Sequence, residues 1–204
     1  MSPQVEQTAR GVLSQPAGSR RAASSPRIQT MSLLIAGTLC IDTIETPTGK
    51  AERVLGGSGA FSAIAAAFFT RPSLVSAVGN DFPPQHRELL TVRGIDLSGV
   101  QTLGDVPTQF WHGRYQAGLH TRDHIAVDMD IFDRWKPVVP AELQDSSHVF
   151  LAHMPPNLQL AVLDQLQGTP CVLADTIDYW IRTRREEVVR LFSRVCCSDQ
   201  RRRS

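Results

Sequence analysis

The chain has 204 residues, of which 42% are hydrophobic and 20% are charged, and its formal net charge is +1. This balance gives no overall attraction to nucleic acid or to an anionic membrane, because both attractions need a dense basic surface. No apolar run approaches the roughly 20 residues that span a bilayer. The composition therefore predicts a globular protein without nucleic-acid or membrane partners.

Four cysteines in a chain of this length do not make a disulfide framework. Cys40 and Cys171 lie in apolar runs, where a thiol is usually a small buried hydrophobe. Cys196 and Cys197 are adjacent, which suits neither a disulfide nor a zinc-binding C-x-x-C pair. These patterns predict a reducing, cytoplasmic location and no metal site.

Residues 1–30 are rich in Ser, Ala, Gln, Pro and Arg and contain one acidic residue, Glu6. Such a composition does not bury enough apolar surface to offset the entropy lost on ordering, so it predicts a disordered leader. The Arg- and Ser-rich, acid-poor start also fits an organellar transit peptide. A third reading is a start codon placed too early, because a clean strand pattern opens at Met31.

From Met31 onward, short apolar runs alternate with helical patterns. Strands are predicted at 32–37, 74–78, 148–152 and 171–174, and helices at 58–70, 85–92, 158–166 and 186–195. In the first helix, Phe61, Ile64, Ala65 and Phe68 are spaced i, i+3, i+4 and i+7, which predicts its buried face. Strands that alternate with helices predict an α/β fold with a layered, Rossmann-like, mostly parallel sheet.

Two segments break this alternation. Residues 108–130 alternate apolar and polar side chains around a Gly-containing turn, which predicts a β-hairpin. With residues 44–54 they predict a small projecting β-sheet that acts as a lid. The strand expected after the 186–195 helix is absent, so residues 196–204 are predicted to be an unstructured tail, and the chain to be truncated at its C-terminus.

Candidate binding residues follow the first strand and precede the first helix. Asp42 comes shortly after the 32–37 strand, where open α/β sheets bind ligands, and a carboxylate there accepts hydrogen bonds from sugar hydroxyls. Taken alone, Asp42 favours a turn or capping role, which is common after strands. Gly56, Gly57 and Gly59 allow close approach of a ligand to the backbone at a helix start. The pattern lacks the third glycine of a dinucleotide fingerprint, which argues against a nicotinamide-binding domain.

Four motifs stand in order along the chain: Gly37-x-x-x-x-Asp42, Gly56-Gly-Ser-Gly-Ala60, Val78-Gly-Asn-Asp-Phe82 and Arg93-Gly-Ile-Asp96. Their order and spacing resemble the N-terminal portion of the PfkB (ribokinase-like) carbohydrate kinases. The resemblance covers residues 32 to about 195. It implies the ribokinase-like fold, a sugar or polyol substrate, and ATP with Mg²⁺ as cofactors of the intact family.

The resemblance also assigns roles to residues. Asp42, Gly56 and Gly57 match family positions that bind sugar hydroxyls, and Thr108 and Arg114 lie in the lid where they are expected to contact substrate. Phe61 stands where many members carry an Asn that contacts the sugar. The family's C-terminal Gly-Ala-Gly-Asp motif, which carries the catalytic base, and its Asn-x-x-Glu motif are absent from this sequence. The chain is therefore expected to contain no catalytic residue and to be inactive alone.

Other polar residues carry weaker signals. His120 and His124 are four residues apart, but in a strand-like segment, so the pattern favours exposed lid residues over metal ligands. His153, Asp175 and Asp178 follow predicted strands and are candidates for the cleft, with core or turn roles as the alternatives.

The sequence thus predicts an ATP-dependent kinase of a sugar or polyol hydroxyl, cut off before its catalytic and ATP-binding motifs. The alternative is a non-catalytic pseudoenzyme or small-molecule-binding fragment. Self-association through the lid or an exposed sheet edge is expected in either case.

Overall fold

The computed structural model describes residues 31–195, so the predictions for residues 1–30 and 196–204 lie outside the described part of the chain. The main sheet contains five parallel strands in the order β5-β4-β1-β8-β9. These strands are β1 (Leu33–Ala36), β4 (Ser73–Gly79), β5 (Asp96–Leu103), β8 (His148–Leu151) and β9 (Cys171–Ala174). A parallel sheet of this kind needs cover on both faces, which explains the apolar runs of β1, β4 and β8.

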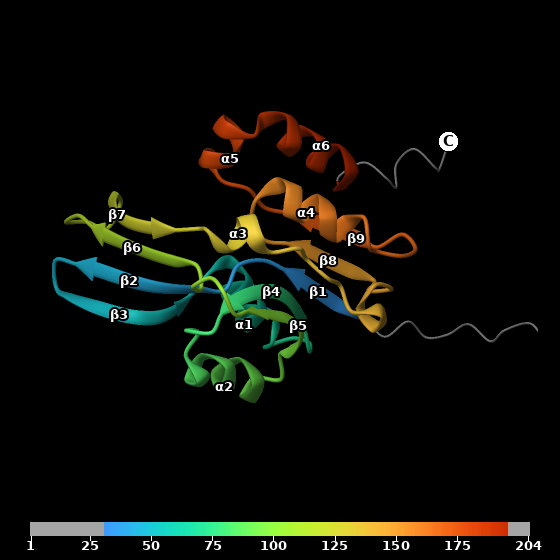
Figure 1. The fold of residues 1–204 in the computed structure, drawn as a ribbon, viewed down its shortest axis with the longest axis horizontal. Coiled ribbons are helices and arrows are strands. Elements are labelled where there is room, and N and C mark those ends of the chain that lie inside the picture. Colours follow the sequence, from blue (N-terminus) through green and yellow to red (C-terminus); the bar gives the residue numbers. More distant parts are fainter. Residues whose placement is uncertain (1–30, 196–204) are drawn as a thin grey trace, which may run out of the picture.

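Helices cover the two faces of the main sheet (Figure 1). The helices are α1 (Ser58–Ala66), α2 (Pro84–Val92), α3 (Ile131–Arg134), α4 (Pro156–Leu163), α5 (Asp178–Thr183) and α6 (Arg185–Val195), with a 3₁₀ turn at Ala141–Leu143. One core cluster joins α1 and α2 to the sheet through Ile35, Leu74 and Leu90. The other joins α3, α4 and α6 through Leu34, Leu151 and Leu191. Two cores on opposite sheet faces confirm the predicted layered α/β fold.

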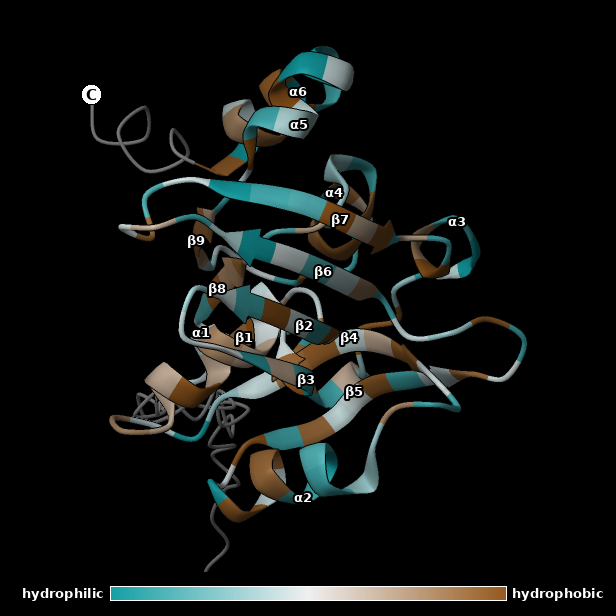
Figure 2. Ribbon diagram, turned by 90° about the vertical axis from the view of Figure 1, so that its left-hand side faces the viewer, coloured by the Kyte–Doolittle hydropathy of each residue, from teal (hydrophilic) through white to brown (hydrophobic). Residues whose placement is uncertain are grey.

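A second, four-stranded sheet projects from the main domain (Figure 1). Its strands are β2 (Cys40–Thr46), β3 (Gly49–Gly56), β6 (Phe110–Tyr115) and β7 (Arg122–Asp128), in the order β3-β2-β6-β7. The hairpins β2–β3 and β6–β7 are antiparallel, and β2 pairs with β6 in parallel. In Figure 2, β7 changes from hydrophilic at its start to hydrophobic at its end, where it joins the main domain. We call this four-stranded sheet the lid.

The buried face of α1 differs from the predicted one. Phe61 is 59% exposed and Phe68 is 81% exposed, while Gly59, Ala60 and Ala63 are buried. A Cβ on Gly37 would lie 3.0 Å from the Gly59 Cα, so the helix rests directly on the backbone of the loop after β1. The prediction of a helix buried along its phenylalanines is wrong, because only small side chains allow this close approach.

One further sequence prediction needs correction. Cys171 is exposed rather than buried, while Cys40 is buried as expected. The strand β5 and the short helix α5 had no sequence prediction.

On the side of the sheet where α1 lies, no described element covers β9, and Leu173 is 64% exposed. A shallow hollow of about 170 Å³ lies there, between Met31, Phe150 and Leu173.

No helix within residues 31–195 is long and apolar enough to cross a bilayer.

Candidate functional site

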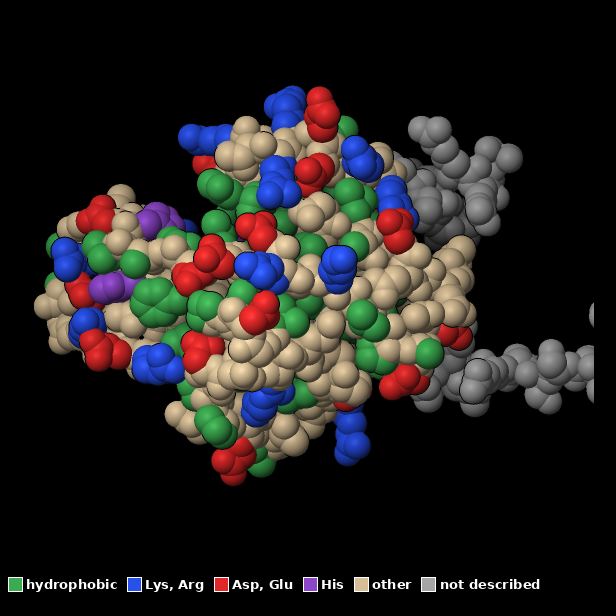
Figure 3. Space-filling view, in the orientation of Figure 1, with side chains coloured by type: hydrophobic (Ala, Val, Ile, Leu, Met, Phe, Trp, Pro, Cys, Tyr) green, Lys and Arg blue, Asp and Glu red, His purple; other side chains and the backbone are tan. Residues whose placement is uncertain are grey.

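A cleft of about 610 Å³ lies between the lid and the carboxyl ends of β1, β8 and β9. In Figure 3 a notch on the visible face separates the lid from the α5 and α6 region. The carboxyl ends of parallel strands are where α/β sheets bind their ligands. The cleft is lined by Thr38, Cys40, Asp42, Gly57, Ser58, Gln109, Trp111, Arg122, His124, Val127, Met129, His153, Ile177, Asp178 and Tyr179.

Asp42 lies on β2 at the point where the lid meets the main domain. Its side chain is 9% exposed, and its Oδ1 atom is buried without a hydrogen-bond partner among the described residues. Burial raises the pKa of the Asp42 carboxyl above its ordinary value, and a hydrogen bond from the Cys40 thiol opposes part of that rise. A buried acceptor that lines a cleft and lacks a partner is suited to accept a hydrogen bond from a ligand.

Gln109 provides a second acceptor of the same kind. It is 8% exposed, lines the cleft, and its Oε1 atom is buried without a partner among the described residues. Its backbone carbonyl accepts a hydrogen bond of 2.9 Å from the Ile41 amide, which joins the start of the lid hairpin to β2. No sequence motif predicted a role for Gln109, because its place in the cleft depends on the hydrogen bond to Ile41, which is 68 residues away in the chain.

The predicted glycines shape the cleft in different ways. A Cβ on Gly56 would collide with the Asp42 carboxylate, so only glycine leaves that carboxylate its place. Gly57 lines the cleft with φ +97°, in the left-handed region that favours glycine, and a Cβ there would collide with the Thr38 carbonyl oxygen. The structure therefore brings Asp42, Gly56 and Gly57 together.

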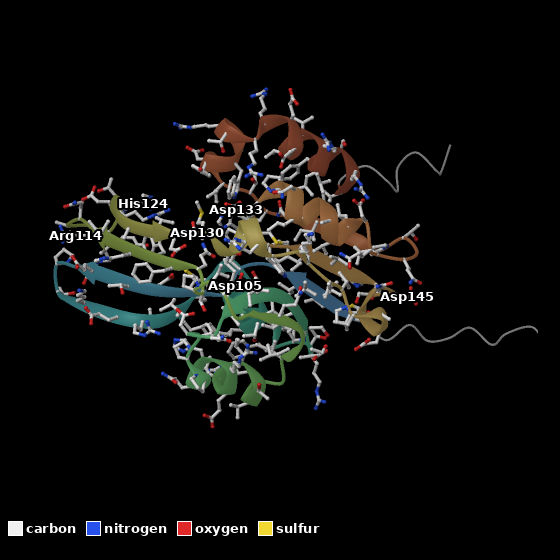
Figure 4. All side chains as sticks on the ribbon, viewed as in Figure 1. Asp105, Arg114, His124, Asp130, Asp133 and Asp145 are labelled. Carbon is white, nitrogen blue, oxygen red and sulfur yellow. The ribbon has the colours of Figure 1, made fainter. Side chains whose placement is uncertain are left out.

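Thr108 and Arg114 are not brought to the cleft. The Thr108 hydroxyl donates a hydrogen bond of 2.7 Å to Asp81 and accepts one of 2.9 Å from the Gly79 amide. Arg114 pairs with Glu45 at 2.6 Å. Arg114 and His112 both bond the Glu45 carboxylate, whereas the Trp111 ring lies over Gly113, so Arg114 and Trp111 lie on opposite faces of the lid. Figure 4 shows Arg114 near the free end of the lid and His124 closer to the main domain.

Trp111 forms the lid wall of the cleft together with His124. A Cβ on Gly113 would collide with the Trp111 indole, so the ring lies along its own strand over that glycine. The indole Nε1 donates a hydrogen bond of 2.9 Å to His124 Nδ1. Arg122, Val127 and Met129 complete this wall. His120, by contrast, is exposed in the turn before β7 and does not line the cleft.

His153 and the start of α5 form the opposite wall. The Trp180 indole Nε1 donates a hydrogen bond of 3.0 Å to His153 Nε2. Burial lowers the pKa of His153, and the charge of Asp175 opposes part of that shift. Asp178 and Tyr179 line the cleft, and Asp178 pairs with Arg182 at 2.8 Å, whereas Asp175 does not line it.

The longer described helices do not offer a cradle for a nucleotide triphosphate, which needs free amides at a helix start. At α1, the amides of Ser58, Gly59 and Ala60 all donate to Thr38. The helices α2 and α4 begin with prolines, and α6 has two glutamates in its first turn. Within residues 31–195 no group of three or more His, Cys, Asp or Glu side chains is arranged to hold a metal ion. Among the described helices of eight or more residues, none therefore begins with free amides for a triphosphate.

Sequence comparison relates the chain to a kinase. It is 30% identical over 142 residues to the cytidine kinase of Thermococcus kodakarensis, an alignment that covers 68% of this chain and 49% of that protein. The chain thus spans about half the length of the curated relative it matches. No family model matches the chain.

Solved structures share the fold at low sequence identity. The nucleoside kinase of Methanocaldococcus jannaschii, described as an archaeal member of the ribokinase family, is 15% identical with a TM-score of 0.61, covering 81% of this chain and 59% of that one. An uncharacterized sugar kinase of Pyrococcus horikoshii, in complex with ATP, is 15% identical with a TM-score of 0.57, covering 78% and 58%. These similarities confirm the expected ribokinase-like fold.

Proposed function

Because the chain resembles the ribokinase-like carbohydrate kinases in sequence and has their fold, we propose that it forms the acceptor-binding part of an ATP-dependent kinase. The acceptor is a small polyhydroxylated molecule: a sugar, a polyol or the ribose of a nucleoside. The relative in Thermococcus kodakarensis is named for a nucleoside, cytidine. Unpaired Cys40 and Cys171 are compatible with a reducing compartment such as the cytoplasm.

One observation carries the proposal: Asp42 and Gln109 line the same cleft, and each has a buried acceptor atom, Oδ1 and Oε1, without a described partner. Leaving such atoms unpaired costs about 1–3 kcal/mol each, and ligand hydroxyl groups would remove that cost. A hydrogen bond to an ionised carboxylate contributes about 1.5–3 kcal/mol. The site therefore favours a ligand with several hydroxyl donors.

In this proposal the chain's own residues bind and orient the acceptor. Asp42 accepts hydrogen bonds from hydroxyl groups, Gly57 lets the ligand approach the backbone, and the lid excludes water from above. The longer described helices supply no triphosphate cradle, so the phosphoryl donor and the catalytic base would be held by residues outside 31–195. The 204-residue sequence contains neither the Gly-Ala-Gly-Asp nor the Asn-x-x-Glu motif.

The second candidate function is a non-catalytic ligand-binding protein. It is favoured by the occupied amides at α1 and by the prolines that begin α2 and α4. Both candidates predict acceptor binding, and they differ in whether phosphate is transferred once the missing groups are supplied.

The experiment is calorimetric titration of the chain with ribose, ribitol and cytidine. We expect at least one of these ligands to bind, and Asp42→Asn to weaken that binding about 10- to 100-fold, because a charged hydrogen bond is lost. The matched control is Asp145→Asn, an exposed aspartate that makes no hydrogen bond to described residues. Failure of all three ligands to bind, or equal affinity of the Asp42→Asn variant, would refute the proposal.

A further inference from the structure

Each wall of the cleft carries a tryptophan hydrogen-bonded to a histidine. On the lid, Trp111 donates to His124 Nδ1 at 2.9 Å; on the other wall, Trp180 donates to His153 Nε2 at 3.0 Å. Both histidines line the cleft. Binding of sugar hydroxyls by Asp42 uses neither pair, so the pairs call for a separate explanation.

The Trp180 bond fixes the tautomer of His153. An indole N–H can only donate, so His153 Nε2 must accept and carries no proton. Burial lowers the pKa of His153, so the ring is neutral near pH 7 and its single proton sits on Nδ1. No described residue is hydrogen-bonded to Nδ1. His153 lines the cleft, and the N–H that remains on its ring, at Nδ1, has no described partner.

Trp180 itself is held firmly. It is 4% exposed, and the Arg184 guanidinium lies 5.4 Å from its ring centroid. Arg184 in turn donates a hydrogen bond of 3.1 Å to the Asn157 side chain at the start of α4. A fixed indole keeps the imidazole oriented, in the way that a residue behind a binding group preorganises it.

Beside the charged Arg122 and Asp178, five of the lining residues are apolar or aromatic and suit a flat group better than a second sugar. Ile177 and Tyr179 extend the wall of His153, and Trp111, Val127 and Met129 extend the lid wall opposite. Aromatic faces and apolar walls bind planar rings by stacking, which contributes about 1–3 kcal/mol per nucleobase. The Ser58 hydroxyl donates to the His153 carbonyl oxygen at 2.9 Å, so this wall adjoins the Gly57–Ser58 turn.

We propose that the cleft between Trp111 and Tyr179 is a subsite for a planar nitrogen heterocycle, and that His153 Nδ1 donates to an acceptor atom on the edge of that ring. The acceptor substrate is then a nucleoside, with its ribose on Asp42 and Gly57. His153 is the specificity-determining residue, and Trp180 is a positioning residue that acts through it. This inference rests on the proposed function.

The binding test compares two ligands that differ only in the base: cytidine and methyl β-D-ribofuranoside. The full chain should bind cytidine more tightly. His153→Leu should weaken cytidine about 5- to 10-fold and leave the methyl riboside unchanged, because one neutral hydrogen bond is lost. His153→Asn, whose side-chain amide places an N–H near the position of Nδ1, should retain most of the cytidine affinity.

A second measurement needs no ligand. Nitrogen-15 NMR of the imidazole should show the Nδ1–H tautomer of His153 in the wild-type chain, and a mixture of tautomers in Trp180→Phe. A purely structural role for Trp180 would lower stability without changing the tautomer. An Nε2–H or charged ring in the wild-type chain would overturn the inference.

The ligand outcomes separate the two proposals. If the methyl riboside binds as tightly as cytidine, the heterocycle subsite is refuted while acceptor binding stands. If neither ligand binds and ribitol also fails, the proposed function is refuted and the subsite with it. If His153→Leu weakens the binding of both ligands equally, His153 supports the structure of the cleft and does not recognise the base.

Discussion

Asp42→Asn should stabilise the protein at neutral pH while weakening acceptor binding about 10- to 100-fold. Asp42 is 9% exposed and one of its carboxylate oxygens is buried without a described partner, so the charge is poorly solvated and this lowers the stability of the folded state. Burial accordingly raises the pKa of Asp42. An orphaned buried polar group costs about 1–3 kcal/mol, and the uncharged amide of asparagine avoids most of the penalty that comes from the charge.

The sign of the pH dependence follows from linkage. Because the pKa of Asp42 is raised on folding, the folded chain holds the proton more tightly than the unfolded chain. The stability that this proton contributes is present below the ordinary aspartate pKa of about 3.9 and is lost as the pH rises through the folded pKa. The advantage of Asp42→Asn should therefore be largest near pH 7 and should vanish toward pH 4.

The assay is thermal or urea unfolding of the wild-type chain and of Asp42→Asn between pH 4 and pH 8. For a chain of this size a gain of about 1–3 kcal/mol raises the Tm by about 2–12 °C at pH 7. Asp145→Asn should change neither the Tm nor its pH dependence; Figure 4 shows Asp145 at the opposite end of the molecule from the lid. A variant that is destabilised by the same amount at every pH would refute the reasoning, because the carboxylate would then be well satisfied in the folded protein.

Gly56→Ala should weaken acceptor binding about 10-fold or more, since its Cβ would displace the Asp42 carboxylate. In a double-mutant cycle with Asp42→Asn it should weaken binding little further. Fully additive losses of binding free energy would show that the two residues act independently. Gly113→Ala should push the Trp111 indole off its strand and change the tryptophan fluorescence, and an unchanged spectrum would show that the ring has other room. Leu173→Lys should reduce self-association and dye binding at the uncovered face of β9, measured by sedimentation, unless the wild-type chain is already monomeric. The 204-residue chain with ATP should phosphorylate neither ribose nor cytidine above a heat-treated control; turnover lost in Asp42→Ala would contradict this expectation.

Local sequence patterns were sufficient to predict the central strands of the main sheet and one hairpin of the lid. The strands β1, β4 and β8 read as apolar runs because a parallel strand is covered on both faces. The hairpin β6–β7 was predicted from its alternation, which follows from one face meeting the cleft and one meeting solvent. The strand β5 escaped prediction because it lies at the sheet edge and carries Asp96, Ser98 and Gln101.

The candidate site was predictable only in part. Asp42, Gly56 and Gly57 form a local motif, and the structure shows that a Cβ on Gly56 would occupy the place of the carboxylate. Thr108 and Arg114 were chosen by position in the lid, and a segment alone does not reveal which strand face meets the cleft. Their partners Asp81 and Glu45 are 27 and 69 residues away.

The sequence by itself determined the strands β1, β4, β8 and β9 with the helices between them, the glycine turns and the resemblance to a kinase family, because these depend on the spacing of neighbouring residues. The tertiary structure alone decided which face of α1 is buried and which side chains meet across the cleft. Phe61 has the spacing of a core residue yet is exposed, because the contact of Gly37 with Gly59 leaves no room for a large side chain. The pairing of Trp180 with His153 joins helix α5, which follows β9, to the loop that follows β8, and such a contact exists only once the sheet has brought the ends of β8 and β9 together.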